Sequence, residues 1–175
     1  MPDMSHLNIE IKASCPNLDR IRDLLKSKNA VFKGIDHQVD TYFKVNSGRL
    51  KLREGNIENH LIYYERENKG EPKESLVILH KYNPDQSLKE ILTKSLGVLA
   101  VVNKHREIYF IDNVKFHLDN VVGLGTFVEI EAIDEDGSIG NEKLHEQCEY
   151  YVKLLNILKE DLIASSYSDM LLAKN

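Results

Sequence analysis

The sequence has little of several residue types that mark particular protein classes. It has no Trp and only two Cys, and the separation of Cys15 from Cys148 matches no metal or redox motif. We therefore expect both cysteines to be small core residues rather than ligands. An apolar run of the roughly 20 residues that cross a bilayer is missing. The segment from Met1 to His6 is polar and lacks a signal-peptide pattern, so we expect a cytoplasmic protein with no membrane partner.

An excess of positive charge is missing as well. The chain has 28 Asp and Glu residues against 23 Lys and Arg residues, which gives a formal net charge of -5 at pH 7. Proteins that bind nucleic acid without sequence preference usually carry a basic surface, so this balance argues against nucleic acid as the partner. The basic residues that are present gather in particular segments. The length of 175 residues fits a single domain with a sizeable core.

What the chain does have is a series of short strand-like segments separated by turn residues. They are residues 7–13, 38–44, 49–54, 61–66, 75–81, 102–110, 114–118 and 126–132. Eight such strands joined by turns are typical of a closed antiparallel sheet.

Helices are expected between and after these strands. Apolar residues recur at helical spacing over 18–25, 88–96 and 144–158, and a short fourth helix is expected over about 166–173. The second helix follows Ser87, with Glu90 three residues later, which is the pattern of a capping box. The sequence therefore predicts an α+β fold: an eight-stranded antiparallel β-barrel with helices packed outside, in one domain over residues 1–175.

Several strands alternate charged and aliphatic residues, which places charge on one face only. In the first strand, Asn8, Glu10 and Lys12 alternate with aliphatic residues. For any single strand, an ordinary sheet with a solvated charged face would explain the pattern. Taken together, the strands favour another arrangement, because the apolar helix stripes need the aliphatic faces as their packing partner. The charged faces would then line the lumen of the barrel, where charges must be paired or bound to a ligand.

The charges expected in this lumen are of two kinds. The basic residues are Lys12, Lys51, Arg53, Arg66, Lys81, Lys104 and Arg106, and the carboxylates are Glu10, Asp119, Glu129 and Glu131. Lys and Arg recognise phosphate oxygens, whereas clustered carboxylates suit Mg²⁺ or Mn²⁺. Arg49 has the same parity but is expected at the mouth of the barrel. Both kinds together indicate phosphoryl or nucleotidyl transfer.

The same segments resemble the CYTH superfamily, which contains class IV adenylyl cyclases and thiamine triphosphatases and has a triphosphate tunnel fold. Residues 8–12 (Asn-Ile-Glu-Ile-Lys) are similar to its opening Glu-x-Glu-x-Lys motif. Residues 48–54, 102–109 and 117–131 resemble its later strands, and residues 166–171 resemble the cyclase-type branch. The resemblance covers essentially the whole chain.

The resemblance implies a role for each set of lumen residues. The basic set would grip the phosphates of ATP or another triphosphate, and the carboxylate set would hold Mg²⁺ or Mn²⁺. A homodimer is compatible with this family. One residue departs from the motif, because its first carboxylate is replaced by the neutral Asn8. No side-chain general base stands out.

Three functions remain open on this basis. The first is the class IV adenylyl cyclase reaction, from ATP to cyclic AMP and pyrophosphate. The second is hydrolysis of inorganic or thiamine triphosphate, which would use nearly the same lumen. The third is a non-catalytic binder of nucleotide or polyphosphate, which Asn8 suggests because a neutral ligand weakens a metal site.

Overall fold

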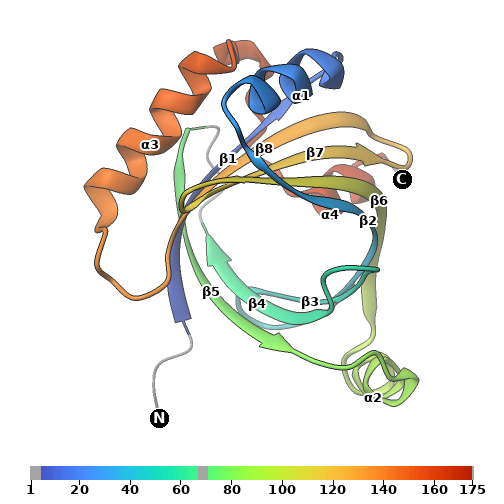
Figure 1. The fold of residues 1–175 in the computed structure, drawn as a ribbon. Helices are drawn as coiled ribbons and strands as arrows, with labels where there is room; N and C mark the ends of the chain where they lie inside the picture. Colours follow the sequence, from blue (N-terminus) through green and yellow to red (C-terminus); the bar gives the residue numbers. More distant parts are fainter. Residues whose placement is uncertain (1–4, 67–70, 175) are drawn as a thin grey trace.

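Eight antiparallel strands close into one barrel in the computed structural model, which describes residues 5–66 and 71–174 (Figure 1). Around the barrel the strands follow the order β1-β5-β4-β3-β2-β6-β7-β8. Their bounds are β1 Ser5–Ser14, β2 Val31–Phe43, β3 Arg49–Glu54, β4 His60–Arg66, β5 Lys73–Lys81, β6 Val98–Ile111, β7 Val114–Val121 and β8 Gly125–Asp134. The predicted α+β class and closed barrel are confirmed.

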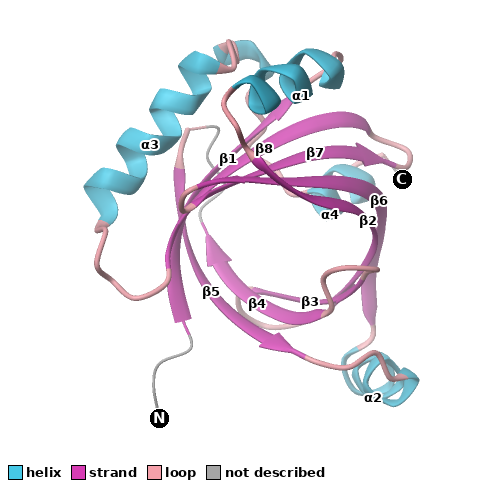
Figure 2. Cartoon of the chain, viewed as in Figure 1, coloured by secondary structure: helices cyan, strands magenta, loops and turns pink. Residues whose placement is uncertain are grey.

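The helices lie outside this barrel, as Figure 2 shows. They are α1 Leu18–Ser27, α2 Gln86–Leu96, α3 Asn141–Leu154 and α4 Tyr167–Leu172, with a short 3₁₀ helix at Lys159–Asp161. Among the residues that the structure describes, none of these helices is long and apolar enough to cross a membrane.

The main apolar core lies between the outer face of the barrel and two helices, α1 and α3. Ile9 and Ile130 point outward from β1 and β8 and are fully buried. Ile21 of α1 and Leu144 of α3 pack against the same surface. Cys148 belongs to this core and is a free thiol, as is the buried Cys15. Because the aliphatic faces point outward to the helices here, the alternate charged faces must point inward.

Two strands are longer than the alternation predicted. β2 begins at Val31 and β6 begins at Val98, and they pair from Val31 with Phe110 to Phe43 with Val98. Their added ends carry exposed apolar side chains, including Val31 and Val98, so no burial pattern marks them. The pairing shifts between Phe32 and Gly34, and Gly34 has a φ of 126°, which favours glycine.

The predicted capping box of the second helix is wrong. α2 begins at Gln86, and its cap is Asp85, whose side chain accepts a hydrogen bond from the backbone N–H of Ser87. An aspartate just before the helix takes the role that the sequence pattern assigned to Ser87. The capping box occurs instead at α4, between Ser166 and Asp169.

The two ends of the barrel are covered by different segments. At one end, the Arg49 guanidinium at the start of β3 donates to the carboxylate of Asp169 in α4, with both distances 2.8 Å. At the other end, β3 leads into the segment 55–59, which returns the chain to β4. Helix α4 and the segment 55–59 therefore lie at opposite ends of the lumen.

Candidate functional site

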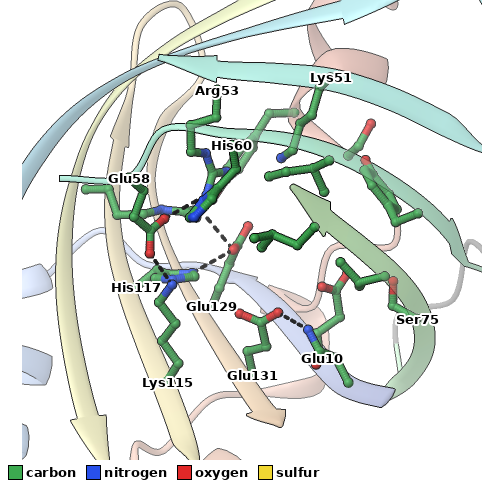
Figure 3. Close-up of a pocket in the computed structure, with 18 of the residues that line it drawn as sticks. Glu10, Lys51, Arg53, Glu58, His60, Ser75, Lys115, His117, Glu129 and Glu131 are labelled. Carbon is green, nitrogen blue, oxygen red and sulfur yellow. Dashed lines mark hydrogen bonds and ion pairs between the residues drawn. The ribbon is translucent and has the colours of Figure 1, made fainter. Parts of the chain in front are cut away.

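The barrel encloses a cavity of about 130 Å³, measured as the space open to the centres of water molecules. Most of the residues predicted for the lumen line it. They are Lys12, Lys51, Arg53, Lys104 and Arg106 from the basic set, with Glu10, Glu129 and Glu131 from the acidic set. Figure 3 shows the labelled members of both sets pointing into one space. The inward parity of their strands brings them together from β1, β3, β6 and β8.

One buried carboxylate, Asp40 of β2, gathers three of these cations. It accepts hydrogen bonds from Lys51 Nζ at 3.0 Å, from Lys104 Nζ at 2.9 Å and from Arg53 through two nitrogens, both at 2.9 Å. Burial would raise the pKa of Asp40, but the charges of Arg53, Lys104 and Lys51 hold it well below its ordinary value. Asp40 therefore serves as the counter-ion of the basic wall.

A second carboxylate, Glu129 of β8, gathers the other two predicted cations that line the cavity. It lies 3.3 Å from Lys12 Nζ and 3.0 Å from a guanidinium nitrogen of Arg106. Nδ1 of His117 lies 3.1 Å from the same carboxylate. Burial and the nearby charge of Arg106 lower the pKa of His117 to about 3, so its ring is neutral at pH 7. The Nε2 atom of this ring is buried and has no hydrogen-bond partner among the described residues.

The third acidic feature is the pair Glu10 and Glu131, which face each other across β1 and β8. Burial raises the pKa of Glu131 to about 6; Lys115 opposes the shift, whereas Glu10 and Glu129 add to it. The amide of Asn8 donates a hydrogen bond to Glu131, and Asn8 Oδ1 is buried without a partner among the described residues. The carboxylates of Glu10 and Glu131 and the amide of Asn8 therefore lie together where β1 and β8 line the cavity.

This donor set fits a hard divalent cation. In the described residues, no group of three or more His, Cys, Asp and Glu side chains is already arranged to hold a metal ion. Mg²⁺, however, is usually held by one or two carboxylates and completes its shell with water and substrate phosphates. Glu10 and Glu131 meet that requirement, and a cation between them would favour the charged form of Glu131, whose pKa is raised.

The structure places two predicted site residues elsewhere. Asp119 is fully buried behind the cavity wall, where its oxygens accept from Arg106 at 2.7 and 2.5 Å and from the Tyr167 hydroxyl at 2.7 Å. Lys81 is exposed at the end of β5 and does not line the cavity. The side chain of Arg66 lies outside the described residues. Asp119 is thus already engaged by Arg106 and by Tyr167 of α4.

Sequence reasoning missed several lumen residues. Lys115 and His117 share the inward parity of Asp119 on β7, and Asp40 shares that of Gln38 on β2, so alternation could have identified all of them. On β7 the alternation is regular, because Lys115 and His117 alternate with the core residues Val114, Phe116 and Leu118. On β2 it is weaker, because the polar Thr41 and the aromatic Tyr42 reverse the pattern. Glu58 is different: it lies on a loop, where no periodicity marks a side chain that enters a lumen.

The lumen also has an apolar wall, which adjoins the charged residues at Lys51. Ile62 and Tyr64 of β4, Val77 and Leu79 of β5, and Tyr42 of β2 line the cavity and pack in one cluster. The strands β4 and β5 lie side by side in the barrel, so their inward side chains form one continuous surface. The site thus combines a charged half with an aromatic and aliphatic half.

Comparison with known proteins gives a consistent result. The family model for the CYTH domain matches residues 6–167 of this chain. A protein of Methanocaldococcus jannaschii named "Putative adenylate cyclase MJ0240" is 27% identical over 173 residues, which covers 94% of this chain and 98% of the relative. The solved structure of the PH1012 protein from Pyrococcus horikoshii has a TM-score of 0.79 and 26% identity, covering 93% of this chain and 98% of its own.

A more distant solved structure shares the fold. It is the Hippeastrum protein named "Putative adenylyl cyclase HpAC1", whose description adds a dominant triphosphatase activity. It has a TM-score of 0.63 and 14% identity, covering 97% of this chain and 95% of its own.

Proposed function

Because this chain belongs to the CYTH domain family, we propose that it is a metal-dependent enzyme that acts on a nucleoside triphosphate by the class IV adenylyl cyclase reaction. The observation that carries this proposal is the two-sided lumen. Its charged wall offers Lys12, Lys51 and Lys104 to phosphate oxygens. The adjoining surface of β4 and β5 offers Ile62, Val77 and Leu79 to a flat, largely apolar group, with the Tyr42 and Tyr64 rings next to Lys51. A ligand with a triphosphate at one end and a base at the other matches both walls.

The reaction is an internal displacement at the α-phosphorus of ATP. A bond forms between the ribose 3′-oxygen and this phosphorus, and the bond from the phosphorus to the bridging oxygen breaks. Pyrophosphate leaves with the electron pair of the broken bond, and the proton of the 3′-hydroxyl passes to solvent. Lys51, Arg53 and Lys104 would hold the β- and γ-phosphates in place and stabilise the charge that develops on pyrophosphate.

A bound Mg²⁺ or Mn²⁺ would draw charge from the phosphates and favour loss of the hydroxyl proton. Glu10 and Glu131 would hold this cation, with the oxygen of Asn8 beside them. Glu129 would position Lys12 and Arg106 next to it. Asn8 contributes no charge, so this site would bind the metal less tightly than a site with a third carboxylate.

Hydrolysis of a triphosphate is the second candidate. The same cations would hold inorganic or thiamine triphosphate while water attacks the terminal phosphorus and the diphosphate product leaves. The activity described for the Hippeastrum protein supports this alternative. Binding of a nucleotide without turnover is the third candidate, and the neutral Asn8 supports it.

Product analysis separates these functions. The purified chain is incubated with ATP, thiamine triphosphate or tripolyphosphate in the presence of Mn²⁺, and the products are resolved by chromatography. We expect cyclic AMP and pyrophosphate in equal amounts from ATP. Release of orthophosphate from any of the three substrates would instead identify a triphosphatase. Binding of ATP without any product would leave only the third candidate.

Binding of the triphosphate is expected to take up a proton at pH 8. Burial lowers the pKa of Lys104 to about 7, against the favourable charge of Asp40, so most of its amine is neutral at pH 8 without ligand. Phosphate oxygens favour the charged amine, so the bound state takes up a proton and affinity falls as pH rises above 7, by up to about ten-fold per pH unit.

Calorimetry of ATP binding in buffers of different ionisation enthalpy measures this proton uptake. The titrations are run in EDTA so that no turnover occurs. Lys104→Arg keeps a permanent charge and is expected to remove most of the uptake. The exposed Lys94→Arg on α2 is the control and should leave it unchanged. Equal uptake in all three proteins would assign the proton to another group.

A further inference from the structure

One carboxylate of the cavity has no role in the phosphate binding or the metal binding proposed above. Glu58 comes from the segment 55–59 between β3 and β4, and its side chain is 14% exposed and points into the cavity (Figure 3). One oxygen accepts from Arg53 at 3.0 Å and from Gln38 at 3.2 Å, and the other accepts from Lys115. Burial would raise the pKa of Glu58, but Lys115 and Arg53 hold it far below its ordinary value.

The position of Glu58 across the lumen is unusual. Arg53 lies on β3 and Lys115 on β7, and these strands are separated by β2 and β6 in the barrel. A carboxylate that contacts both must therefore lie across the interior, rather than along one wall. It occupies the space between two cations that would otherwise continue the basic row of Lys51 and Lys104.

The loop that carries Glu58 is built to hold it there. The buried carboxylate of Asp36 accepts from the backbone N–H of Ile57 at 2.9 Å and of Glu58 at 3.0 Å. The amide of Asn59 closes the turn onto Gly55 through two hydrogen bonds of 3.0 Å. A Cβ atom at Gly55 would lie 2.7 Å from both Asp36 oxygens, so only glycine fits at this close approach.

We propose that Glu58 is a specificity-determining residue that ends the phosphate-binding row and so selects a triphosphate over longer phosphate chains. The inference rests on the proposed function, since it requires that the basic wall holds a triphosphate. A further phosphate group would have to enter the space between Arg53 and Lys115, where it would meet the fixed negative charge of Glu58. Repulsion of like charges in a confined site is an efficient way to reject a wrong ligand.

At the other end of the row, an aromatic ring lies beside the last cation. Lys12 Nζ lies 4.0 Å from the centre of the Tyr167 ring, which α4 brings into the lumen. Tyr167 is buried, and its hydroxyl donates to Asp119. A longer chain that slides away from Glu58 would therefore meet this ring instead of a further cation.

The test compares phosphate chain lengths in wild-type protein and in Glu58→Gln. Affinities for inorganic tripolyphosphate and tetraphosphate are measured by calorimetry in EDTA, so that metal and turnover play no part. We expect wild type to bind tetraphosphate roughly ten-fold or more weakly than tripolyphosphate. In Glu58→Gln the two affinities should come within about three-fold, because the neutral amide removes the repulsion. Glu54→Gln is the matched control, since Glu54 pairs with Lys89 and does not line the cavity.

Each outcome has a distinct meaning. Equal binding of both chains by wild type overturns the inference without any variant. A similar gain for both chains in Glu58→Gln also overturns it, because Glu58 would then be a displaceable counter-ion. Failure of wild type to bind tripolyphosphate at all would reject the proposed function itself. If Glu58→Gln does not fold, equal binding of both chains by wild type still overturns the inference.

Discussion

Asp40→Ala is expected to lower the free energy of unfolding by about 3–5 kcal/mol, the usual cost of removing one partner from a buried ion pair. The side chain of Asp40 is 1% exposed, and its two oxygens serve Lys51, Arg53 and Lys104. Without this carboxylate, three cations would face one another inside the barrel. The lowered pKa of Lys104 shows that its charge is already costly even with Asp40 present.

Denaturant unfolding at pH 7 measures this loss. Asp40→Asn should fall between wild type and Asp40→Ala, because an amide oxygen accepts hydrogen bonds but carries no charge. The exposed Asp23→Asn on α1 is the control and should change stability by less than about 0.5 kcal/mol. Tripolyphosphate should stabilise Asp40→Ala more than wild type, since its charge replaces the missing carboxylate. A loss below about 1 kcal/mol would show that the cations find other partners.

The alternation of charged and aliphatic residues along the strands made the fold and much of the site predictable from sequence. Successive side chains of a strand point to opposite faces, so on β1 the side chains of Glu10 and Lys12 lie on the face away from Ile9 and Ile11. The apolar faces of the helices need an apolar surface to pack against, so the aliphatic faces of the strands had to lie on the outside of the barrel. The same reasoning correctly placed Arg53, which lines the cavity.

Residues whose position depends on pairing between strands or on a loop could not be predicted in this way. Parity places Asp119 inside the barrel, but only the register of β7 with β6 shows that it lies opposite Arg106. Lys81 has the inward parity of β5 and is nevertheless exposed, because the strand ends there. Glu58 enters the lumen through a turn that Asp36 holds by backbone hydrogen bonds, and this contact joins segments distant in sequence.

Glu131→Gln is expected to reduce metal-dependent turnover by at least about a hundred-fold while it stabilises the fold. Glu131 lies opposite Glu10, where the two carboxylates would share the cation. Burial and neighbouring carboxylates raise its folded-state pKa to about 6 from an ordinary 4.5, so the cost of its charge is absent at pH 4 and complete above pH 7. The variant should therefore gain up to about 2 kcal/mol at pH 7.5 and almost nothing at pH 4.

Denaturant unfolding at these two pH values tests the gain in stability. The shift of the melting temperature by Mn²⁺, with ATP absent, tests metal binding without using activity. Wild type should be stabilised by Mn²⁺, and Glu131→Gln should be stabilised much less. An equal Mn²⁺ shift in both proteins would show that Glu131 does not hold the metal.

Glu129→Gln provides the contrast, because Glu129 lies two residues away on the same face of β8 but in the opposite electrostatic setting. Burial would raise the pKa of Glu129, but Arg106 and Lys12 hold it well below its ordinary value, so its charge favours the folded state above the unfolded pKa. Its loss should therefore destabilise the protein at pH 7.5, whereas the loss of Glu131 should stabilise it. If both variants stabilise the fold, or if both destabilise it, then the two carboxylates do not have separate roles, Glu129 as a partner of cations and Glu131 as a metal ligand. Opposite signs from two adjacent inward positions would be difficult to explain in any other way, since the substitution, the strand and the burial are the same.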